Sequence, residues 1–269
     1  MRTLVLMAKA PRPGSAKTRL AGGAVARNSE RGSASSPSAD STRGSALRAA
    51  HPGSPDVDLA GAARIAEGLF RDALATCVAA AAANEAELVL AFTPASERAW
   101  FAEELARAEA ARDGAGSQRA VALRLVAQAD GDLTPRLQAV TADAFARGAR
   151  SVVVVGTDAP ELSTADVERA FELLATRDVA LGRSADGGYW LVGLARDEPR
   201  VFAGIPWSTE RVRAATLARA AELGLAVGEL DLHVDVDEPE DLAWLARWLA
   251  EEPVTRAAHV RAALAQLGR

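Results

Sequence analysis

Four basic side chains lie close together near the start of the chain, in the segment MAKAPRPGSAKTRL at residues 7–20. They are Lys9, Arg12, Lys17 and Arg19, and they follow a short apolar run. Because Lys and Arg give charge-assisted hydrogen bonds to phosphate oxygens, such a cluster could hold the phosphates of a nucleotide. A solvated charged loop is the plainer interpretation, and this segment alone leaves both open.

The segment is not a Walker phosphate loop. That pattern would place its lysine and hydroxyl at Lys17 and Thr18, and it would then require glycine at positions 11 and 16. Those positions are Pro11 and Ala16. Proline has no N–H to donate to a phosphate, and alanine resists the positive φ that such loops often need. A phosphate site here would therefore depend on the side-chain cations.

Isolated carboxylates occur at three other points, each next to a run that predicts a strand. Asp158 follows SVVVVG, and Asp186 follows DVALG. Asp235 and Asp237 lie in HVDVDEPEDL, just before a predicted helix. Mg²⁺ prefers one or two carboxylates together with phosphate oxygens and water. Cations from one loop and carboxylates from the others would suit a metal-bound nucleotide phosphate.

Each carboxylate also has a purely structural interpretation. Asp158 could shape the turn after its strand, and the run Asp186-Gly187-Gly188 could be a hairpin turn. Asp237 fits a helix N-cap, with Glu240 three residues later. Asp235 could belong to the polar face of an edge strand. Their joint placement at strand ends favours the functional interpretation over any single alternative.

Apolar runs alternate with amphipathic segments along the chain, which predicts an α/β fold with a mostly parallel sheet covered by helices. We expect strands near residues 3–8, 88–92, 121–126, 151–156, 178–182, 188–194 and 225–230. We expect helices near 59–82, 95–110, 134–147 and 208–222, and one that begins with a capping box at Ser163 and Asp166. Ligands bind beyond the carboxyl ends of parallel strands, so the basic loop and the carboxylates should meet at one edge. The pattern does not determine the strand order.

Residues 21–58 differ from the rest of the chain in composition. The segment has eight serines, no aromatic residue and few large apolar side chains. Such a segment cannot bury enough surface to offset the entropy lost on ordering. We interpret it as a disordered insertion in a single domain that spans residues 1–269.

The overall composition excludes several classes of protein. With 269 residues and 49% hydrophobic content, the chain can build one sizeable α/β core. A net charge of −5 gives no general affinity for nucleic acid or anionic membranes. A single cysteine, Cys77, excludes an internal disulfide, and the three histidines lack zinc spacing. The first apolar run is too short for a signal peptide or a membrane span, so we expect a soluble, cytoplasmic protein.

Six ordered motifs resemble a known bacterial family: MAKAPRPGSAKTRL, GDLTPRL, VVVVGTDAPEL, ADGGYWLVGL, GIPWSTERV and DVDEPEDL. The family comprises GT-A-type, glycosyltransferase-like proteins formerly described as domain of unknown function 2064, and it is similar to the guanylyltransferase of coenzyme F420 synthesis. The resemblance covers nearly the whole chain outside residues 21–58. It implies a three-layer α/β/α, Rossmann-like GT-A domain that binds a nucleoside triphosphate or a nucleotide-diphospho-sugar with Mg²⁺ or Mn²⁺.

The resemblance also implies roles for particular residues. The phosphate-contacting loop would comprise Lys9, Pro11, Arg12, Gly14, Lys17 and Arg19, and the base or sugar would lie near Asp132 and Arg136. The metal ligands would be Asp158 and Asp237, with Asp235 as the alternative. Asp158 and Lys17 would be the catalytic residues. The acceptor side would be lined by Asp186, Gly187, Gly188 and Tyr189.

The chain departs from the family pattern at two places. The family loop normally runs directly into a helix, whereas here the segment at 21–58 intervenes. Thr134-Pro135 replaces a common Gly-Glu pair, which affects the contacts expected around Asp132.

These observations predict a metal-dependent transferase with a nucleotide-activated donor and a small-molecule acceptor. The family description favours glycosyl transfer, while the strongly cationic loop favours nucleotidyl transfer from a triphosphate. A non-catalytic nucleotide-binding protein is the alternative of another class, although it would not need the carboxylates.

Two carboxylates that share a metal repel each other when the metal is absent. We therefore expect Asp158→Asn to preserve or raise the stability of the metal-free protein.

Overall fold

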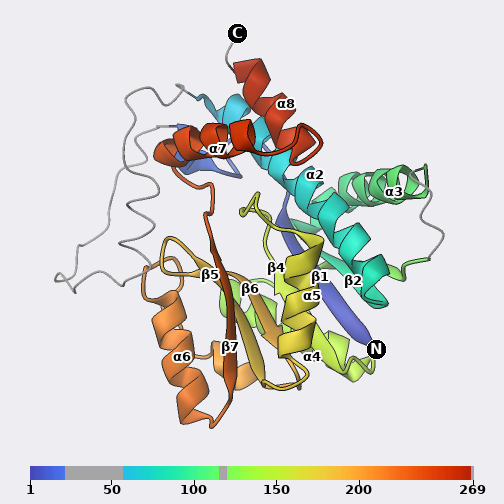
Figure 1. Ribbon diagram of the computed structural model, residues 1–269, viewed down its shortest axis with the longest axis vertical. Helices are drawn as coiled ribbons and strands as arrows, with labels where there is room; N and C mark the ends of the chain where they lie inside the picture. Colours follow the sequence, from blue (N-terminus) through green and yellow to red (C-terminus); the bar gives the residue numbers. More distant parts are fainter. Residues whose placement is uncertain (22–56, 115–119, 268–269) are drawn as a thin grey trace, which may run out of the picture.

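The computed structural model describes residues 1–21, 57–114 and 120–267 (Figure 1). Most of the segment at 21–58, where we expected a disordered insertion, lies outside the described residues. Its first residue, Ala21, belongs to a short 3₁₀ helix over Thr18–Ala21. Its last two residues also belong to the folded structure: Val57 is buried, and the Asp58 side chain caps a helix by accepting the Gly61 N–H at 2.6 Å. The expected boundary is corrected there, because the helix needs a cap and Val57 packs in an apolar cluster.

Strands and helices alternate as the sequence predicted. Their order is β1 (Arg2–Lys9), η1 (Thr18–Ala21), α2 (Leu59–Ala83), β2 (Ala86–Thr93), η2 (Ala95–Glu97), α3 (Arg98–Gly114), β3 (Leu123–Ala127), α4 (Leu133–Ala146), β4 (Ser151–Val155), α5 (Thr164–Leu173), β5 (Val179–Ser184), β6 (Tyr189–Leu194), η3 (Pro199–Phe202), α6 (Val212–Glu222), β7 (Val227–His233), α7 (Pro239–Glu251) and α8 (Ala258–Leu267). The capping box at Ser163 and Asp166 is present at the start of α5. Helix α8 has no counterpart among the expected elements.

The strands of the described chain form one sheet in the order β3-β2-β1-β4-β6-β5-β7. Neighbouring strands are parallel except where β6 pairs with β4 and with β5. This confirms the expected α/β class with a mostly parallel sheet.

Side chains of β1 alternate between two apolar layers. Leu4 and Leu6 pack in one cluster with Phe70 of α2, whereas Val5 packs in the other with Leu137 of α4. The strand is therefore buried on both faces, as expected of a central parallel strand. Helices cover both faces of the sheet, which gives three layers (Figure 1).

The order of the strands opens a crevice at one edge of the sheet. After β1 the chain adds β2 and β3 on one side, and it then returns to place β4 on the other side of β1. The loops that leave β1 and β4 diverge at such a switch point, where open α/β sheets bind their ligands. The basic loop after Lys9 and the loop that carries Asp158 flank this crevice.

The run Asp186-Gly187-Gly188 is the hairpin turn between β5 and β6, as its structural interpretation predicted. The Asp186 side chain accepts the Gly188 N–H at 2.8 Å. Gly187 has a φ of 91°, and a Cβ there would lie 2.2 Å from the carbonyl oxygen of Glu210. The turn therefore requires glycine for its own geometry and for close packing.

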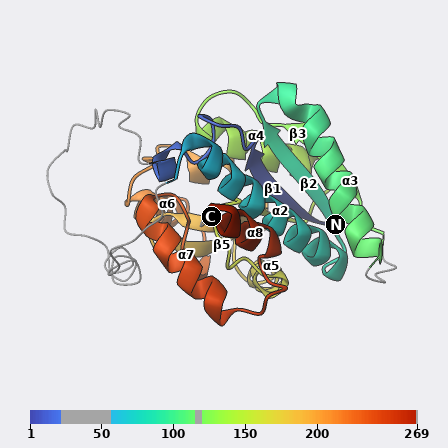
Figure 2. The ribbon, with the colours of Figure 1, turned by 90° about the horizontal axis from the view of Figure 1, so that it is seen from above.

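Helix α8 lies along α2, with α7 beside it (Figures 1 and 2). Asp72 of α2 caps α8, because its carboxylate accepts the N–H groups of His259 at 3.1 Å and Val260 at 2.9 Å. The same carboxylate lies 2.8 Å from Nδ1 of His259. At Gly68, a Cβ would lie 2.7 Å from the Val260 backbone, so the two helices are in close contact.

The pair His259 and Asp72 should make stability depend on pH. The hydrogen bond to Asp72, opposed by burial, raises the pKa of His259 above its ordinary 6.5. The stabilisation by protonated His259 is therefore complete below pH 6.5 and is lost as pH rises through the raised pKa. We expect thermal unfolding of the parent and His259→Ala to differ most at low pH. In an Asp72→Asn background this pH-dependent difference should disappear, and its persistence would contradict the assignment.

No helix in the described ranges is both long and apolar enough to cross a membrane.

Candidate active site

A pocket of about 450 Å³ lies at the carboxyl ends of β1 and β4. Eight of the residues singled out in the sequence line it: Lys9, Lys17, Arg19, Arg136, Asp158, Tyr189, Asp235 and Asp237. Seven others do not line it: Pro11, Arg12, Gly14, Asp132, Asp186, Gly187 and Gly188. The fold thus brings one set of the expected residues together and gives the other set different surroundings.

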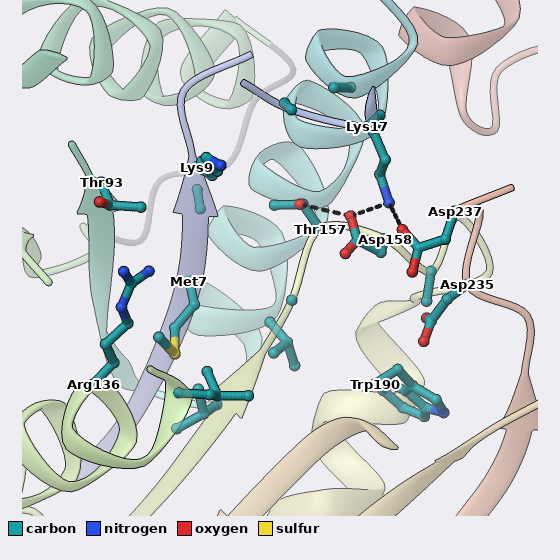
Figure 3. Close-up of a pocket in the computed structure, with 18 of the residues that line it drawn as sticks. Met7, Lys9, Lys17, Thr93, Arg136, Thr157, Asp158, Trp190, Asp235 and Asp237 are labelled. Atoms are coloured by element: carbon teal, nitrogen blue, oxygen red, sulfur yellow. Dashed lines mark hydrogen bonds and ion pairs between the residues drawn. The ribbon is translucent and has the colours of Figure 1, made fainter. Parts of the chain in front are cut away.

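The ammonium group of Lys17 lies between two carboxylates. Its Nζ is 2.6 Å from Asp158 Oδ1 and 2.6 Å from Asp237 Oδ1, and Thr157 Oγ1 donates to the same Asp158 oxygen at 3.3 Å (Figure 3). The Lys17 side chain is 7% exposed, whereas those of Asp158 and Asp237 are 45% and 32% exposed. Burial would lower the pKa of Lys17, but its attraction to Asp158 and Asp237 raises that pKa above the ordinary value. The two carboxylates therefore share one cationic group.

This arrangement corrects the stability effect expected for Asp158→Asn. We reasoned that the two carboxylates would repel each other in the metal-free protein. Lys17 lies between them and neutralises part of their charge. Removal of either carboxylate therefore takes a partner from a buried ammonium, and we expect stability to fall.

A compact turn directs Lys17 into the pocket. The N–H groups of Ser15 and Ala16 donate to the Arg12 carbonyl, and Gly14 has a φ of 73°. Lys17 itself has a φ of 52°, which is uncommon outside glycine. Gly14 thus shapes the loop from a position outside the pocket lining.

Arg12 points away from the pocket. Its guanidinium makes two hydrogen bonds to Glu97, at 2.9 and 2.5 Å, and it lies over the ring of Trp100 at 5.3 Å. This bidentate pair holds the Arg12 guanidinium on the side of the loop that faces α3. The sequence suggested that the four basic side chains form a single cluster. No pattern in the sequence marked Glu97 as the partner of Arg12, because the two residues are 85 positions apart.

Asp235 lies beside the central pair and has different surroundings. Its Oδ2 accepts a hydrogen bond from Ser184 Oγ at 2.6 Å. Burial, together with the negative charges of Asp186, Asp158 and Asp237, raises the pKa of Asp235 well above its ordinary value. Asp158 and Asp237, which contact the ammonium, are therefore the better candidates for holding a cation.

Two hydrogen bonds donated by backbone N–H groups fasten the segment that carries Asp237 to the loop that carries Asp158. The N–H of Val236 donates to the Asp158 carbonyl at 2.9 Å, and that of Val234 donates to Glu161 Oε2 at 2.6 Å. Burial, partly offset by the bond from Val234, raises the pKa of Glu161 to about 7. The sequence analysis missed Glu161, and no local pattern marks its distant partner.

The start of α7 differs from the expectation. Glu238 is the N-cap, and the side chain of Asp241 accepts the N–H groups of Asp237 at 2.9 Å and Glu238 at 2.8 Å. The N-cap expected at Asp237 was wrong, because the capping box at Glu238 and Asp241 starts the helix one residue later. Its spacing was visible in the sequence, where Asp237 and Glu240 offered an equivalent pair. Asp241 thus supports the backbone of a pocket residue.

Gln128 organises the opposite end of the pocket. Its side-chain N–H₂ donates to the carbonyls of Ala8 at 3.1 Å and Ala91 at 2.8 Å, and its oxygen accepts from Arg136 Nη1 at 3.2 Å. Figure 3 shows Arg136, Lys9 and Thr93 on the side away from the Asp158 and Asp237 pair. The sequence analysis did not select Gln128. The pocket therefore has a cationic end and an acidic end.

Asp132 contributes to the fold outside this pocket. It is the N-cap of α4, and its side chain accepts the Thr134 N–H at 2.9 Å. The Thr134 hydroxyl in turn accepts a hydrogen bond from Trp207 Nε1 at 2.7 Å. Trp207 therefore packs against this helix start.

Tyr189 and Trp190 form part of the pocket lining. Burial raises the pKa of Tyr189 above its ordinary value. The Trp190 ring stacks on His233 with centroids 4.2 Å apart, and its Nε1 donates to the Asp231 carbonyl at 3.2 Å. These contacts fix the aromatic wall next to Asp235.

A family model described as "Uncharacterized protein conserved in bacteria (DUF2064)" matches residues 75–209, about half of the chain. The chain belongs to this family. The DUF2064 match contains Asp158, Gln128 and Arg136, whereas Lys17 and Asp237 lie outside its limits. No curated protein matches the DUF2064 chain.

Two solved structures are similar to this DUF2064 chain, and the first of them shares its fold. A candidate nucleotide-diphospho-sugar transferase from Desulfovibrio desulfuricans G20 has a TM-score of 0.68 at 24% identity, covering 99% of this chain and 96% of that one. A 4-diphosphocytidyl-2C-methyl-D-erythritol synthase from Anaerococcus prevotii has a TM-score of 0.49 at 9% identity, covering 93% and 99%. The DUF2064 chain therefore has the Rossmann-like α/β/α fold of the GT-A type that the motifs implied.

Within the described residues, no three His, Cys, Asp or Glu side chains are grouped closely enough to hold a metal ion. The pair Asp158 and Asp237 supplies two converging carboxylates, and phosphate oxygens and water would have to complete the coordination of a divalent ion. A pair of this kind fits Mg²⁺ bound together with a phosphorylated ligand.

Proposed function

We propose that this DUF2064 protein is a transferase that uses a nucleotide-activated donor and a divalent metal ion, Mg²⁺ or Mn²⁺. The convergence of Asp158 and Asp237 on one cationic group, in the pocket at the switch point of the sheet, is the observation that carries this proposal. We assign glycosyl transfer from a nucleotide-diphospho-sugar, in line with the name of the Desulfovibrio relative. We also propose that residues 1–269 act as one domain, since the described strands form one sheet.

Asp158 and Asp237 would hold the metal, with Asp235 as the alternative ligand. A bound divalent ion would neutralise the pyrophosphate of the donor and stabilise it as a leaving group. The two carboxylates suit this role because both already face the same ammonium.

Three basic side chains of the pocket lining, Lys9, Arg19 and Arg136, would bind oxygens of the donor. Gln128 would orient Arg136 through the bond to its Nη1. We place the small-molecule acceptor next to Tyr189, because Asp186, Gly187 and Gly188 do not line the pocket. The acceptor would attack the anomeric carbon of the sugar, and the nucleoside diphosphate would leave.

Nucleotidyl transfer is the second candidate. Lys9, Arg19 and Arg136 suit a triphosphate better than a diphospho-sugar, because a triphosphate carries more negative charge. In that reaction the acceptor would attack the α-phosphorus, and pyrophosphate would leave. A non-catalytic nucleotide-binding protein would bind the same donors without releasing either product.

The test is a panel of nucleoside triphosphates and nucleotide-diphospho-sugars, each with Mg²⁺, read first by thermal shift. A ligand at about 100 times its Kd stabilises a protein by roughly 2.7 kcal/mol, which is a measurable rise in Tm. The stabilising donors are then assayed with candidate acceptors. Release of nucleoside diphosphate would support glycosyl transfer, and release of pyrophosphate would support nucleotidyl transfer. If no member of the panel stabilises the protein, the proposal fails.

Arg136 and Arg12 have the same side chain in different surroundings, so they allow a matched comparison. Arg136 lines the pocket, whereas Arg12 is paired with Glu97 outside it. We expect Arg136→Gln to weaken donor binding by about 1.5 to 3 kcal/mol, the usual contribution of a charged hydrogen bond. Arg12→Gln should leave donor binding unchanged. Isothermal titration calorimetry checks both values, and equal losses in the two variants would contradict the placement of the donor.

A further inference from the structure

Lys17 occupies a position that a divalent ion on the same carboxylates would compete for. Its Nζ contacts Asp158 and Asp237 at 2.6 Å each, while the carboxylates are partly open to the pocket. An ammonium this close to a divalent ion repels it strongly, because both carry positive charge and little water separates them. A metal can bind this pair well only if the ammonium moves.

The loop limits where the ammonium can go. Its backbone is fastened on both sides of Lys17, because the Ser15 N–H donates to the Arg12 carbonyl and the Leu20 N–H donates to the Lys17 carbonyl. The side chain can therefore rotate, but it stays within the pocket.

An ammonium displaced within the pocket needs a new acceptor. A buried charge without a partner is strongly unfavourable, so the displacement has a cost unless an anion receives the group. Asp235 lines the same pocket, but its Oδ2 already accepts a hydrogen bond from Ser184 Oγ at 2.6 Å. The phosphate oxygens of a diphosphate ligand in the same pocket are the better acceptors.

We propose that Lys17 is a built-in counter-ion for Asp158 and Asp237, so that a divalent cation binds this pair strongly only together with a diphosphate ligand that receives the ammonium. The inference rests on the proposed metal site. It makes the metal and the diphosphate mutually dependent, and such coupling is reciprocal between the two ligands. The protein would thereby avoid holding a free divalent ion in the absence of its donor.

The test measures Mn²⁺ binding by electron paramagnetic resonance, with and without imidodiphosphate, in the parent and in Lys17→Met. In the parent, imidodiphosphate should raise Mn²⁺ affinity by roughly tenfold or more, after correction for Mn²⁺ bound by the free ligand. Lys17→Met should bind Mn²⁺ alone roughly tenfold more tightly than the parent and should lose most of the coupling. Its Tm without metal should fall, since two carboxylates then face each other, and Mn²⁺ should restore it.

Controls separate this effect from a general loss of charge. Arg12→Met removes a cation from the same loop outside the pocket, so it should leave Mn²⁺ binding and coupling unchanged. Lys9→Met should weaken imidodiphosphate without tightening Mn²⁺ alone. If Lys17→Met binds Mn²⁺ no more tightly than the parent, the inference is wrong.

Further outcomes are decisive. If Lys17→Met does not fold, the parent still tests the inference. The inference is overturned if imidodiphosphate does not raise the Mn²⁺ affinity of the parent. It is also overturned if Mn²⁺ alone binds the parent tightly, since the ammonium would then have moved to Asp235 or another group. If Mn²⁺ binds neither protein under any condition, or binds Asp158→Asn as well as the parent, then the proposed metal site itself fails.

Discussion

Asp158→Asn should lower metal-dependent turnover by roughly a hundredfold or more, because it removes one of the two carboxylates that we propose as metal ligands. The substitution keeps the shape of the side chain but removes its charge. It should also lower metal-free stability, by about 1 kcal/mol or less, since the carboxylate is 45% exposed and its pairing with Lys17 is screened by solvent. Turnover assays and urea unfolding of the same preparation measure the two effects.

Asp186→Asn is the matched control for this substitution. Asp186 lies in the neighbouring hairpin turn outside the pocket lining, and an asparagine oxygen can still accept the Gly188 N–H. Its turnover should stay close to that of the parent. Retained activity in Asp158→Asn, or an equal loss in Asp186→Asn, would remove Asp158 from the metal site.

Asp241→Ala should have the largest effect on stability, about 2 to 4 kcal/mol. Asp241 is fully buried, and one of its oxygens accepts the N–H groups of both Asp237 and Glu238. Its loss leaves two donors at the start of α7 without this partner. It also frees the backbone that positions the Asp237 carboxylate, so Mn²⁺ affinity in the presence of imidodiphosphate should fall as well.

Asp241→Asn tests whether stability depends on the hydrogen bonds that Asp241 accepts at the start of α7 or on the volume of its side chain. Asparagine retains an oxygen that can accept both N–H groups, so it should recover most of the stability and the Mn²⁺ affinity lost in Asp241→Ala. Urea unfolding and Mn²⁺ titration of the two variants provide the comparison. Equal stability of the alanine and asparagine variants would show that these hydrogen bonds do not support the start of α7.

Local patterns along the chain determined the elements and the fold class. Buried strands such as SVVVV at 151–155 read as uninterrupted β-branched runs, and the capping box at Ser163 marked the start of α5. These signals depend on residues within a few positions of one another, so the sequence displays them directly. The rule that ligands bind at the carboxyl ends of strands then placed the basic loop and Asp158 near one edge of the sheet.

The partners of the charged side chains were decided by the tertiary structure. Arg12 and Lys17 lie five positions apart in one basic loop, yet Arg12 pairs with Glu97 on the outside and Lys17 with Asp237, 220 residues away, in the pocket. The choice between Asp237 and Glu238 as the cap of α7 followed from the burial of Asp241. Such pairings depend on strand order and on which side of a loop faces the core, and those are set by packing between distant segments. The sequence therefore identified which residues could do chemistry, and the fold decided which of them meet.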